Sequence, residues 1–160
     1  MSESGTIRLL VMDVDGVMTD GKVTYTSDGN ELKSFNIKDG LGIKRLQRAG
    51  IQTAIITGRV SPMVARRASE LGIHHLVQGR EDKLTALKEL LTSLQMGLSN
   101  VAYIGDDLPD IDAIVSAGLG ACPANAAHDV LSRADWVSSL NGGEGCVREF
   151  CDHILDDIVS

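Results

Sequence analysis

Three nearly continuous apolar runs stand out along the chain, and each of them ends in polar residues. They are Ile7 to Met12, Gln52 to Ile56 and Val101 to Ile104. Such runs, without polar alternation, are typical of strands that are buried on both faces of a parallel sheet. Shorter runs predict three further strands, at His75–Val77, Leu119–Cys122 and Trp136–Val137.

Apolar residues at helical spacing lie between and after these runs. The spacing predicts four helices, over Leu41–Arg48, Ser61–Leu71, Asp82–Leu94 and Val147–Ile158. Ser61 and Pro62 suit the N-cap and first turn of the second helix, and Gly72 suits its end. This alternation favours an α/β fold, a single domain over residues 1–160 with a doubly wound, mainly parallel sheet covered by helices on both faces.

One segment, about residues 22–37, departs from this alternation. Lys22–Tyr25 and Glu31–Ile37 are extended runs joined by a Ser-Asp-Gly-Asn turn, a pattern that predicts a β-hairpin projecting from the main sheet. An isolated hairpin is marginally stable in water. We therefore expect it to pack on this domain or on another subunit.

The charge balance and the cysteines limit the possible functions. The chain carries 15 basic and 22 acidic side chains, a net charge of −7, which disfavours nucleic-acid binding. No apolar run is long enough to span a membrane, and the first residues lack signal-peptide features, so we expect a cytoplasmic protein. Cys122, Cys146 and Cys151 form no CxxC pair, and neither disulfides nor a zinc site at His74 and His75 is expected.

The first apolar run ends in Asp13-Val14-Asp15-Gly16. In open α/β sheets, sites form beyond the carboxyl ends of the strands. Two carboxylates at this position can hold a divalent cation, which offsets the charge of an incoming phosphate. One acid can then act as a nucleophile, while the other protonates the leaving oxygen and later activates water. A solvated turn is the alternative interpretation of the acidic pair.

Three other segments carry side chains suited to phosphate chemistry. Thr57-Gly58-Arg59 can bind phosphate oxygens or serve as a loop that Thr57 caps. Lys83 lies at the start of a predicted helix, where a positive charge is unfavourable for the helix dipole. That cost is understandable if the side chain turns inward to meet Asp13 and a phosphate group. A solvated lysine is the alternative. Gly105–Asp110 crowds three carboxylates, Asp106, Asp107 and Asp110, which repel one another without a cation or base.

Together, DxDG, TGR, Lys83 and GDDxxD resemble the four signature motifs of the haloacid dehalogenase (HAD) superfamily, over Asp13 to Asp110. The resemblance implies a Rossmann-like core and Mg²⁺-dependent phosphatase activity. It implies that Asp13 is the nucleophile, Asp15 the general acid and base, and Asp106 a Mg²⁺ ligand with Asp13 and the Asp15 carbonyl. The same resemblance assigns the phosphoryl group to Thr57, Gly58 and Lys83 and places Asp107 and Asp110 around the metal ligands.

The segments between the motifs hold only the hairpin, single helices and a short strand, and no cap domain. The stretches FNIKDGLGIK, LGIHHLVQGREDK and GGEGCVRE make the chain similar to the capless, tetrameric HAD phosphatases that act on 3-deoxy-D-manno-octulosonate (KDO) 8-phosphate. That resemblance implies a role in lipopolysaccharide biosynthesis and a homotetramer in which a C-terminal tail, about 138–160, reaches a neighbouring active site. Arg59, Arg80 and Arg148 are the candidates for binding the sugar acid.

Three alternatives remain open at this point. A phosphatase for a sialic-acid-type 9-phosphate would keep the chemistry and change the sugar. A phospho-accepting receiver domain also combines acids, a hydroxyl and a lysine, although its acid pair and phosphorylated Asp lie on different strands. A catalytically inactive regulatory subunit is the third, although every residue that the chemistry needs is present.

Overall fold

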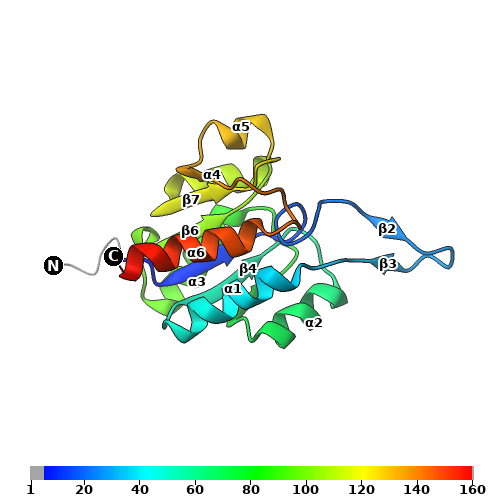
Figure 1. The fold of residues 1–160 in the computed structure, drawn as a ribbon, viewed down its shortest axis with the longest axis horizontal. Helices are drawn as coiled ribbons and strands as arrows, with labels where there is room; N and C mark the ends of the chain where they lie inside the picture. Colours follow the sequence, from blue (N-terminus) through cyan, green and yellow to red (C-terminus); the bar gives the residue numbers. More distant parts are fainter. Residues whose placement is uncertain (1–5, 160) are drawn as a thin grey trace.

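A computed structural model of the chain describes residues 6–159 and contains a parallel six-stranded sheet (Figure 1). The strand order is β5-β4-β1-β6-β7-β8, and every pair in the sheet is parallel. The strand bounds are β1 Leu9–Met12, β4 Gln52–Ile56, β5 His75–Val77, β6 Val101–Ile104, β7 Leu119–Cys122 and β8 Trp136–Val137. Five of the six match the predicted bounds, while the first strand begins two residues later than expected.

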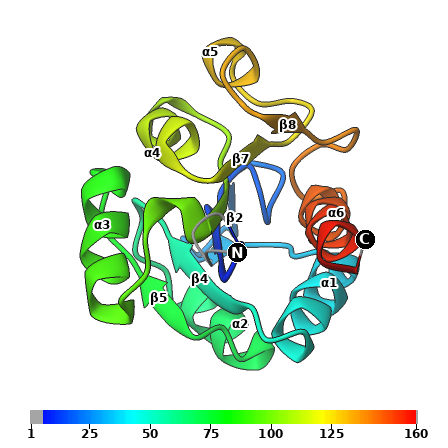
Figure 2. The same ribbon diagram turned by 90° about the vertical axis from the view of Figure 1, so that its left-hand side faces the viewer.

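Helices cover both faces of the sheet, as the alternating pattern predicted. Figure 2 shows α1, α2 and α6 around one side of the sheet and α3 and α4 around the other. The helix bounds are α1 Ile37–Arg48, α2 Pro62–Leu71, α3 Lys83–Leu94, α4 Ile111–Ser116, α5 His128–Leu131 and α6 Cys146–Val159. Short 3₁₀ turns lie at Leu98–Asn100 and Leu108–Asp110. None of the helices within residues 6–159 has the length and apolar character needed to cross a membrane.

The sheet divides the core into two layers, because successive strand residues point to opposite faces. Leu10 and Met12 of β1 pack with Phe150 and other residues of the α1, α2 and α6 side. Leu9 and Val11 pack with Leu87 and other residues of the α3 and α4 side. All four β1 side chains are fully buried, which explains why the strand has no polar alternation.

The ends of α2 follow the predicted capping. The Ser61 hydroxyl accepts a hydrogen bond from the Val64 N–H at 3.4 Å, and Pro62 occupies the first turn. Gly72 ends the helix in the left-handed conformation, with φ of 65°, which costs glycine little. The chain is thus turned back toward β5 at the predicted residue.

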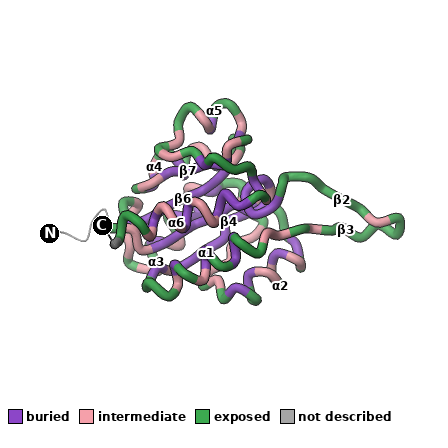
Figure 3. Tube along the Cα trace, in the orientation of Figure 1, coloured by how far each residue is buried: buried purple, intermediate pink, exposed green. Residues whose placement is uncertain are grey.

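The hairpin is shorter than predicted, and α1 begins earlier. Its strands are β2 Thr24–Tyr25 and β3 Glu31–Leu32, which pair antiparallel outside the main sheet. The predicted second strand up to Ile37 is wrong beyond Leu32, because Asn36 caps α1 by accepting a hydrogen bond from the Lys38 N–H. Figures 1 and 3 show the hairpin projecting from the domain with most of its length exposed.

The C-terminal segment, predicted as a tail over residues 138–160, is largely part of the domain. Helix α6 lies beside α1, and its Val147, Phe150 and Ile154 are buried in the core. The glycine loop before it packs on the chain's own Asp13–Gly21 loop. A Cβ on Gly142 would lie 1.9 Å from the Gly16 carbonyl oxygen, so only glycine fits there. Ser160, the last residue of the predicted tail, lies outside the described residues.

Candidate active site

All the predicted site residues except Arg80 and Arg148 line one pocket at the carboxyl ends of β1, β4 and β6. These strands are neighbours, and β1 lies where the chain switches from building one half of the sheet to the other. The pocket has a volume of about 290 Å³. Its lining residues are Asp13, Asp15, Gly21, Thr57, Gly58, Arg59, Glu81, Lys83, Asp106, Asp107, Pro109 and Asp110.

Asp13 and Lys83 form a buried ion pair at this pocket. Lys83 Nζ lies 3.0 Å from Asp13 Oδ1, and the two side chains are 5% and 9% exposed. The Val14 N–H donates to the same oxygen at 2.7 Å, which fixes the orientation of the carboxylate. Burial opposes the charge of Lys83, but Asp13 and Asp110 outweigh burial and raise the lysine pKa. Lys83 therefore turns inward, the first of the two alternatives that its position at the helix start allowed, and stays charged.

Asp110 has all its acceptor positions filled by the protein. Its Oδ1 accepts from Lys83 Nζ at 2.9 Å and from the Tyr103 hydroxyl at 2.6 Å. Its Oδ2 accepts from the backbone N–H groups of Asp106 at 3.0 Å and Asp107 at 3.3 Å. A carboxylate offers about four lone-pair positions, and all four of Asp110 are occupied. Asp110 therefore fixes the loop after β6 and the Lys83 side chain and has no free position for a metal ion.

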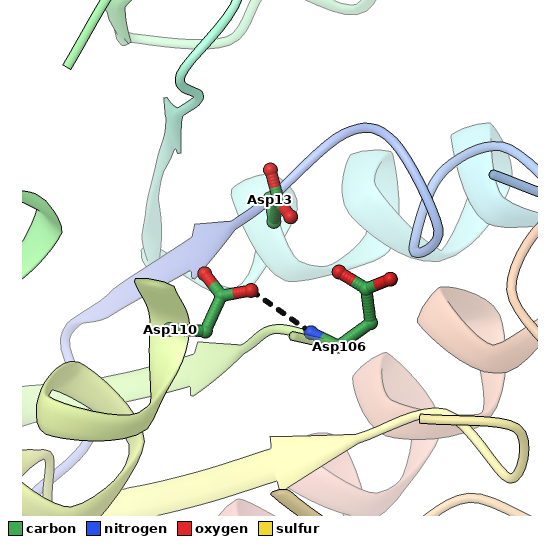
Figure 4. Close-up of side chains that lie close together, drawn as sticks. All are labelled: Asp13, Asp106 and Asp110. Carbon is green, nitrogen blue, oxygen red and sulfur yellow. Dashed lines mark hydrogen bonds between the residues drawn. The ribbon is translucent and has the colours of Figure 1, made fainter. Parts of the chain in front are cut away.

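The carboxyl groups of Asp106 and Asp13 lie close together (Figure 4). Ligand oxygens of Asp13, Asp106 and Asp110 lie within 4.8 Å of one another. Burial, then the charge of Asp110, raises the pKa of Asp13 well above its ordinary value. Burial, with Asp110 and Asp107, raises the pKa of Asp106 to about 6. These carboxylates favour a proton or a cation between them.

The donor set fits Mg²⁺, a hard cation that prefers carboxylate, carbonyl and water oxygens. Because Asp110 is saturated, Asp13 and Asp106 are the carboxylates that remain to hold the ion. Gly16 makes room for this arrangement, since a Cβ there would lie 1.9 Å from Asp106 Oδ2. The φ of Gly16, 87°, also favours glycine.

Asp15 and Thr57 complete the set of motif residues. Asp15 lines the pocket, and its Oδ1 accepts a hydrogen bond from Lys33 Nζ at 2.7 Å. Thr57 is 3% exposed, and its N–H donates to the Val77 carbonyl, which holds the end of β4. Among the described residues no hydrogen-bond partner is found for its hydroxyl. This hydroxyl can therefore donate to a phosphate oxygen.

The three arginines predicted to bind substrate occupy different places. Arg59 lines the pocket and lies 3.1 Å from Glu31 of β3. Arg80 is bound at 2.8 Å by Asp82 and by Glu89, outside the pocket lining. Arg148 lies on α6, where it pairs with Asp152 at 3.1 Å, and it does not line the pocket of its own chain.

Three residues that hold the site were not among the predicted ones: Thr19, Lys33 and Tyr103. The Thr19 hydroxyl accepts from the Gly16 and Gly21 N–H groups, both at 3.2 Å, and so closes the loop after Asp13. Tyr103 was assigned to the core, although a buried tyrosine hydroxyl needs a partner and the acidic loop follows directly. Lys33 lacked any such signal, because a hairpin lysine normally faces water.

Comparisons with known proteins show which family the chain belongs to. The family of haloacid dehalogenase-like hydrolases matches residues 74–150. The 3-deoxy-D-manno-octulosonate 8-phosphate phosphatase of Yersinia pestis is 48% identical over 97% of this chain and 83% of its own length.

Two solved structures are similar over nearly the whole chain. One is a probable YrbI family phosphatase from Pseudomonas syringae pv. phaseolica, with 52% identity and a TM-score of 0.93 over 96% of this chain and 88% of that one. The other is the KDO 8-phosphate phosphatase of Moraxella catarrhalis in complex with magnesium, phosphate and KDO. It has 49% identity and a TM-score of 0.93 over the same shares of the two chains.

The fold and the matched sequence are those of a haloacid dehalogenase-like hydrolase. More narrowly, the chain belongs to the family of 3-deoxy-D-manno-octulosonate 8-phosphate phosphatases. This membership contradicts the alternative of a receiver domain.

Proposed function

We propose that this chain is a Mg²⁺-dependent phosphatase that converts KDO 8-phosphate to KDO and inorganic phosphate. The observation that carries the proposal is the buried Asp13 carboxylate, held 3.0 Å from Lys83 and facing Asp106 in an open pocket. Support for the substrate comes from the Moraxella catarrhalis relative, whose structure holds magnesium, phosphate and KDO. Lipopolysaccharide biosynthesis is the pathway that this substrate implies.

The first chemical step is phosphoryl transfer to Asp13. A carboxylate oxygen of Asp13 forms a bond to phosphorus while the bond from phosphorus to the sugar oxygen breaks. Asp15 donates a proton to the departing oxygen, so the sugar leaves as a neutral alcohol. Bound Mg²⁺, held by Asp13, Asp106 and the Asp15 carbonyl, would offset the negative charge that otherwise repels phosphate from these carboxylates.

The second step returns Asp13 to its starting state. Asp15, now a carboxylate, takes a proton from a water molecule whose oxygen attacks phosphorus. The bond between phosphorus and the Asp13 oxygen breaks, and inorganic phosphate is released. Lys83 and the Thr57 hydroxyl bind phosphate oxygens in both steps, with the Gly58 backbone beside them. Asp107 and Asp110 hold the loop that carries Asp106.

Arg59 is our candidate for binding the substrate carboxylate, because it lines the pocket and its side chain is 45% exposed. Arg80 and Arg148 are weaker candidates in the isolated chain, since neither lines the pocket. We assign Arg148 a role only if it reaches the pocket of a neighbouring subunit.

The quaternary structure belongs to the same proposal. We propose a capless homotetramer in which the exposed hairpin side chains Val23, Tyr25 and Leu32 pack between subunits and the C-terminal segment helps cover a neighbouring pocket. These side chains are 45%, 66% and 53% exposed. Contact of such apolar surface with water is unfavourable, and burial in a subunit interface would remove that contact. Light scattering on the purified protein should give the mass of four chains, and a monomer would contradict this part.

Cytoplasmic location is likewise a proposal. The three cysteines are buried and free, which suits a reducing compartment. Cell fractionation, followed by detection of the protein in the cytoplasmic fraction, tests it.

The test of the proposed activity is phosphate release from KDO 8-phosphate and from a sialic-acid-type 9-phosphate at equal concentration. We expect Mg²⁺-dependent turnover that prefers KDO 8-phosphate and stops with chelator. Faster hydrolysis of the nine-carbon ester would overturn the substrate assignment. Absence of turnover of any phosphate ester would instead support the inactive regulatory subunit.

A further inference from the structure

Lys33 is a buried lysine that the catalytic cycle described above does not use. It follows β3 at the base of the hairpin, and its side chain is only 3% exposed. Taking a lysine out of water is costly unless its charge is paired. Two carboxylates pair with it, Asp15 at 2.7 Å and Glu31 at 3.2 Å.

The contact between Lys33 and Asp15 is specific in its geometry. Lys33 Nζ donates to Asp15 Oδ1, and the structure shows no hydrogen bond to Oδ2 within residues 6–159. Oδ2 is thereby left for a proton, while the other oxygen is held. The Asp15 side chain is 27% exposed, so without this contact it could adopt other rotamers.

The position of Lys33 is itself set by the hairpin. Glu31 lies between two cations, with Oε1 3.2 Å from Lys33 and Oε2 3.1 Å from Arg59. Arg59, Glu31, Lys33 and Asp15 thus form a chain of alternating charges that joins β3 to the pocket. Removing Lys33 would leave the Asp15 and Glu31 carboxylates close together without the cation between them, and they would repel each other.

We propose that Lys33 is a positioning residue, which holds the Asp15 carboxyl group where it can transfer a proton to the leaving oxygen. This inference rests on the proposed phosphatase function and on Asp15 as its general acid. It assigns the hairpin base a part in catalysis within its own chain. The proton transfer is the one described above, from Asp15 to the sugar oxygen as its bond to phosphorus breaks.

The leaving-group dependence of the rate separates positioning from a general structural role. A basic leaving oxygen needs a proton in the transition state, whereas 4-nitrophenolate leaves readily without one. The Lys33→Ala variant should therefore lose roughly tenfold to a hundredfold in kcat on KDO 8-phosphate and less than about threefold on 4-nitrophenyl phosphate. Phenyl phosphate, similar in shape to the nitrophenyl ester, should show an intermediate loss.

Variants of known charge provide the controls. Lys22→Ala removes the same charge from an exposed site at the start of the hairpin and should keep wild-type rates on all three esters. Asp15→Asn gives the leaving-group dependence expected when the acid is absent. Lys33→Arg, which retains the cation, should recover part of the loss on KDO 8-phosphate. A thermal melt of each variant reports the folded state.

The ratio of rates on two esters is measured in one sample, so a partly unfolded variant does not change it. A steeper dependence on leaving-group basicity in Lys33→Ala, with KM little changed, supports the inference. Equal losses on all three esters, or a rise in KM alone, would overturn it. If the wild-type enzyme hydrolyses the aryl esters but not KDO 8-phosphate, the proposed substrate fails, and phenyl against 4-nitrophenyl phosphate still decides the role of Lys33.

Discussion

The carboxyl-end edge of the sheet, where Asp13, Lys83 and Asp110 meet, and the projecting hairpin differ in what holds them in place. At the edge, Asp13, Lys83 and Asp110 are almost completely buried, and each is bonded within the chain. The hairpin consists of two strands of two residues each, and it leaves Tyr25 and Leu32 largely in water. One region satisfies its charges internally, and the other exposes apolar surface.

This difference separates two tasks of the molecule. Phosphoryl transfer needs groups held rigidly, and a network of buried bonds supplies that rigidity. In the proposed homotetramer, a second subunit would cover the exposed hairpin surface and help to enclose the substrate. The chain of charges from Arg59 through Glu31 and Lys33 to Asp15 joins the two regions.

Replacing Lys83 with Met should have the largest effect at the sheet edge. Asp13 and Asp110 would remain buried without their shared cation, which costs about 3–5 kcal/mol of unfolding free energy. Because we propose Lys83 as a phosphate ligand, its loss should also lower kcat by about 10²- to 10³-fold. Urea unfolding and phosphate release measure both effects. Lys88→Met, on the exposed face of the same helix, is the matched control, and equal effects of the two changes would contradict the account.

The pH dependence of stability should reveal Asp39 of α1, which is 2% exposed and accepts a hydrogen bond from the Arg148 N–H at 2.9 Å. Burial raises its pKa to about 6 from an ordinary 3.8. The folded state therefore binds this proton more tightly than the unfolded chain. The carboxylate costs stability increasingly as pH rises from about 4 to 6, and the full cost of about 3 kcal/mol remains above that range.

The Asp39→Asn variant removes this titration and keeps an acceptor for Arg148. Relative to wild type, it should gain about 2 kcal/mol between pH 4.5 and pH 7.5. Urea unfolding at the two pH values measures the difference. A stability difference that is the same at both values would show that Asp39 does not titrate in this range.

Tyr103→Phe should cause a smaller loss of stability than Lys83→Met in the same region. It removes the hydrogen bond to Asp110 Oδ1 and leaves the aromatic ring in the core. A bond to a charged group contributes about 1.5–3 kcal/mol, and we expect a loss of stability near the lower end because Lys83 still pairs with Asp110. Thermal unfolding checks this, and an unchanged melting temperature would show that the Tyr103 hydroxyl does not stabilise the fold through Asp110.

The hairpin should behave in the opposite way, with the smallest effect on the fold. Replacing Tyr25 and Leu32 with Ser should change the unfolding free energy of the dissociated subunit by less than about 0.5 kcal/mol, because both side chains are exposed. The same variant should dissociate at higher protein concentration than wild type. Light scattering over a dilution series measures this, and unchanged dissociation would remove the hairpin from the proposed interface.

The sequence was most informative where burial is complete. Gln52–Ile56 and Val101–Ile104 became strands with the predicted bounds, because both faces of the sheet are covered and every position except Gln52 and Thr53 is apolar. The polar residues after them, Thr57 and Asp106 among them, were predicted as site residues because the ends of neighbouring strands lie side by side. The early start of α1 escaped prediction because Ile37, 82% exposed, resembles a strand residue in an apolar alternation.

Contacts between distant segments were the part that the sequence did not predict. The glycine loop before α6 packs on Gly16, and Asn36 donates to the Gly143 carbonyl at 3.2 Å, although more than a hundred residues separate the partners. Nothing local distinguishes these contacts from a flexible linker. Lys33 was missed in the same way, because its two carboxylate partners are defined only by the folded chain.

We expect Asp13 to be the phosphoryl-accepting nucleophile, and the rate of phosphate release from KDO 8-phosphate by the Asp13→Asn variant checks this role. The amide retains the size of the side chain but is a poor nucleophile. With Mg²⁺ present, we expect turnover to fall to background in a variant whose circular dichroism and thermal melt show a folded protein. Wild-type turnover by a folded Asp13→Asn enzyme would contradict the claim.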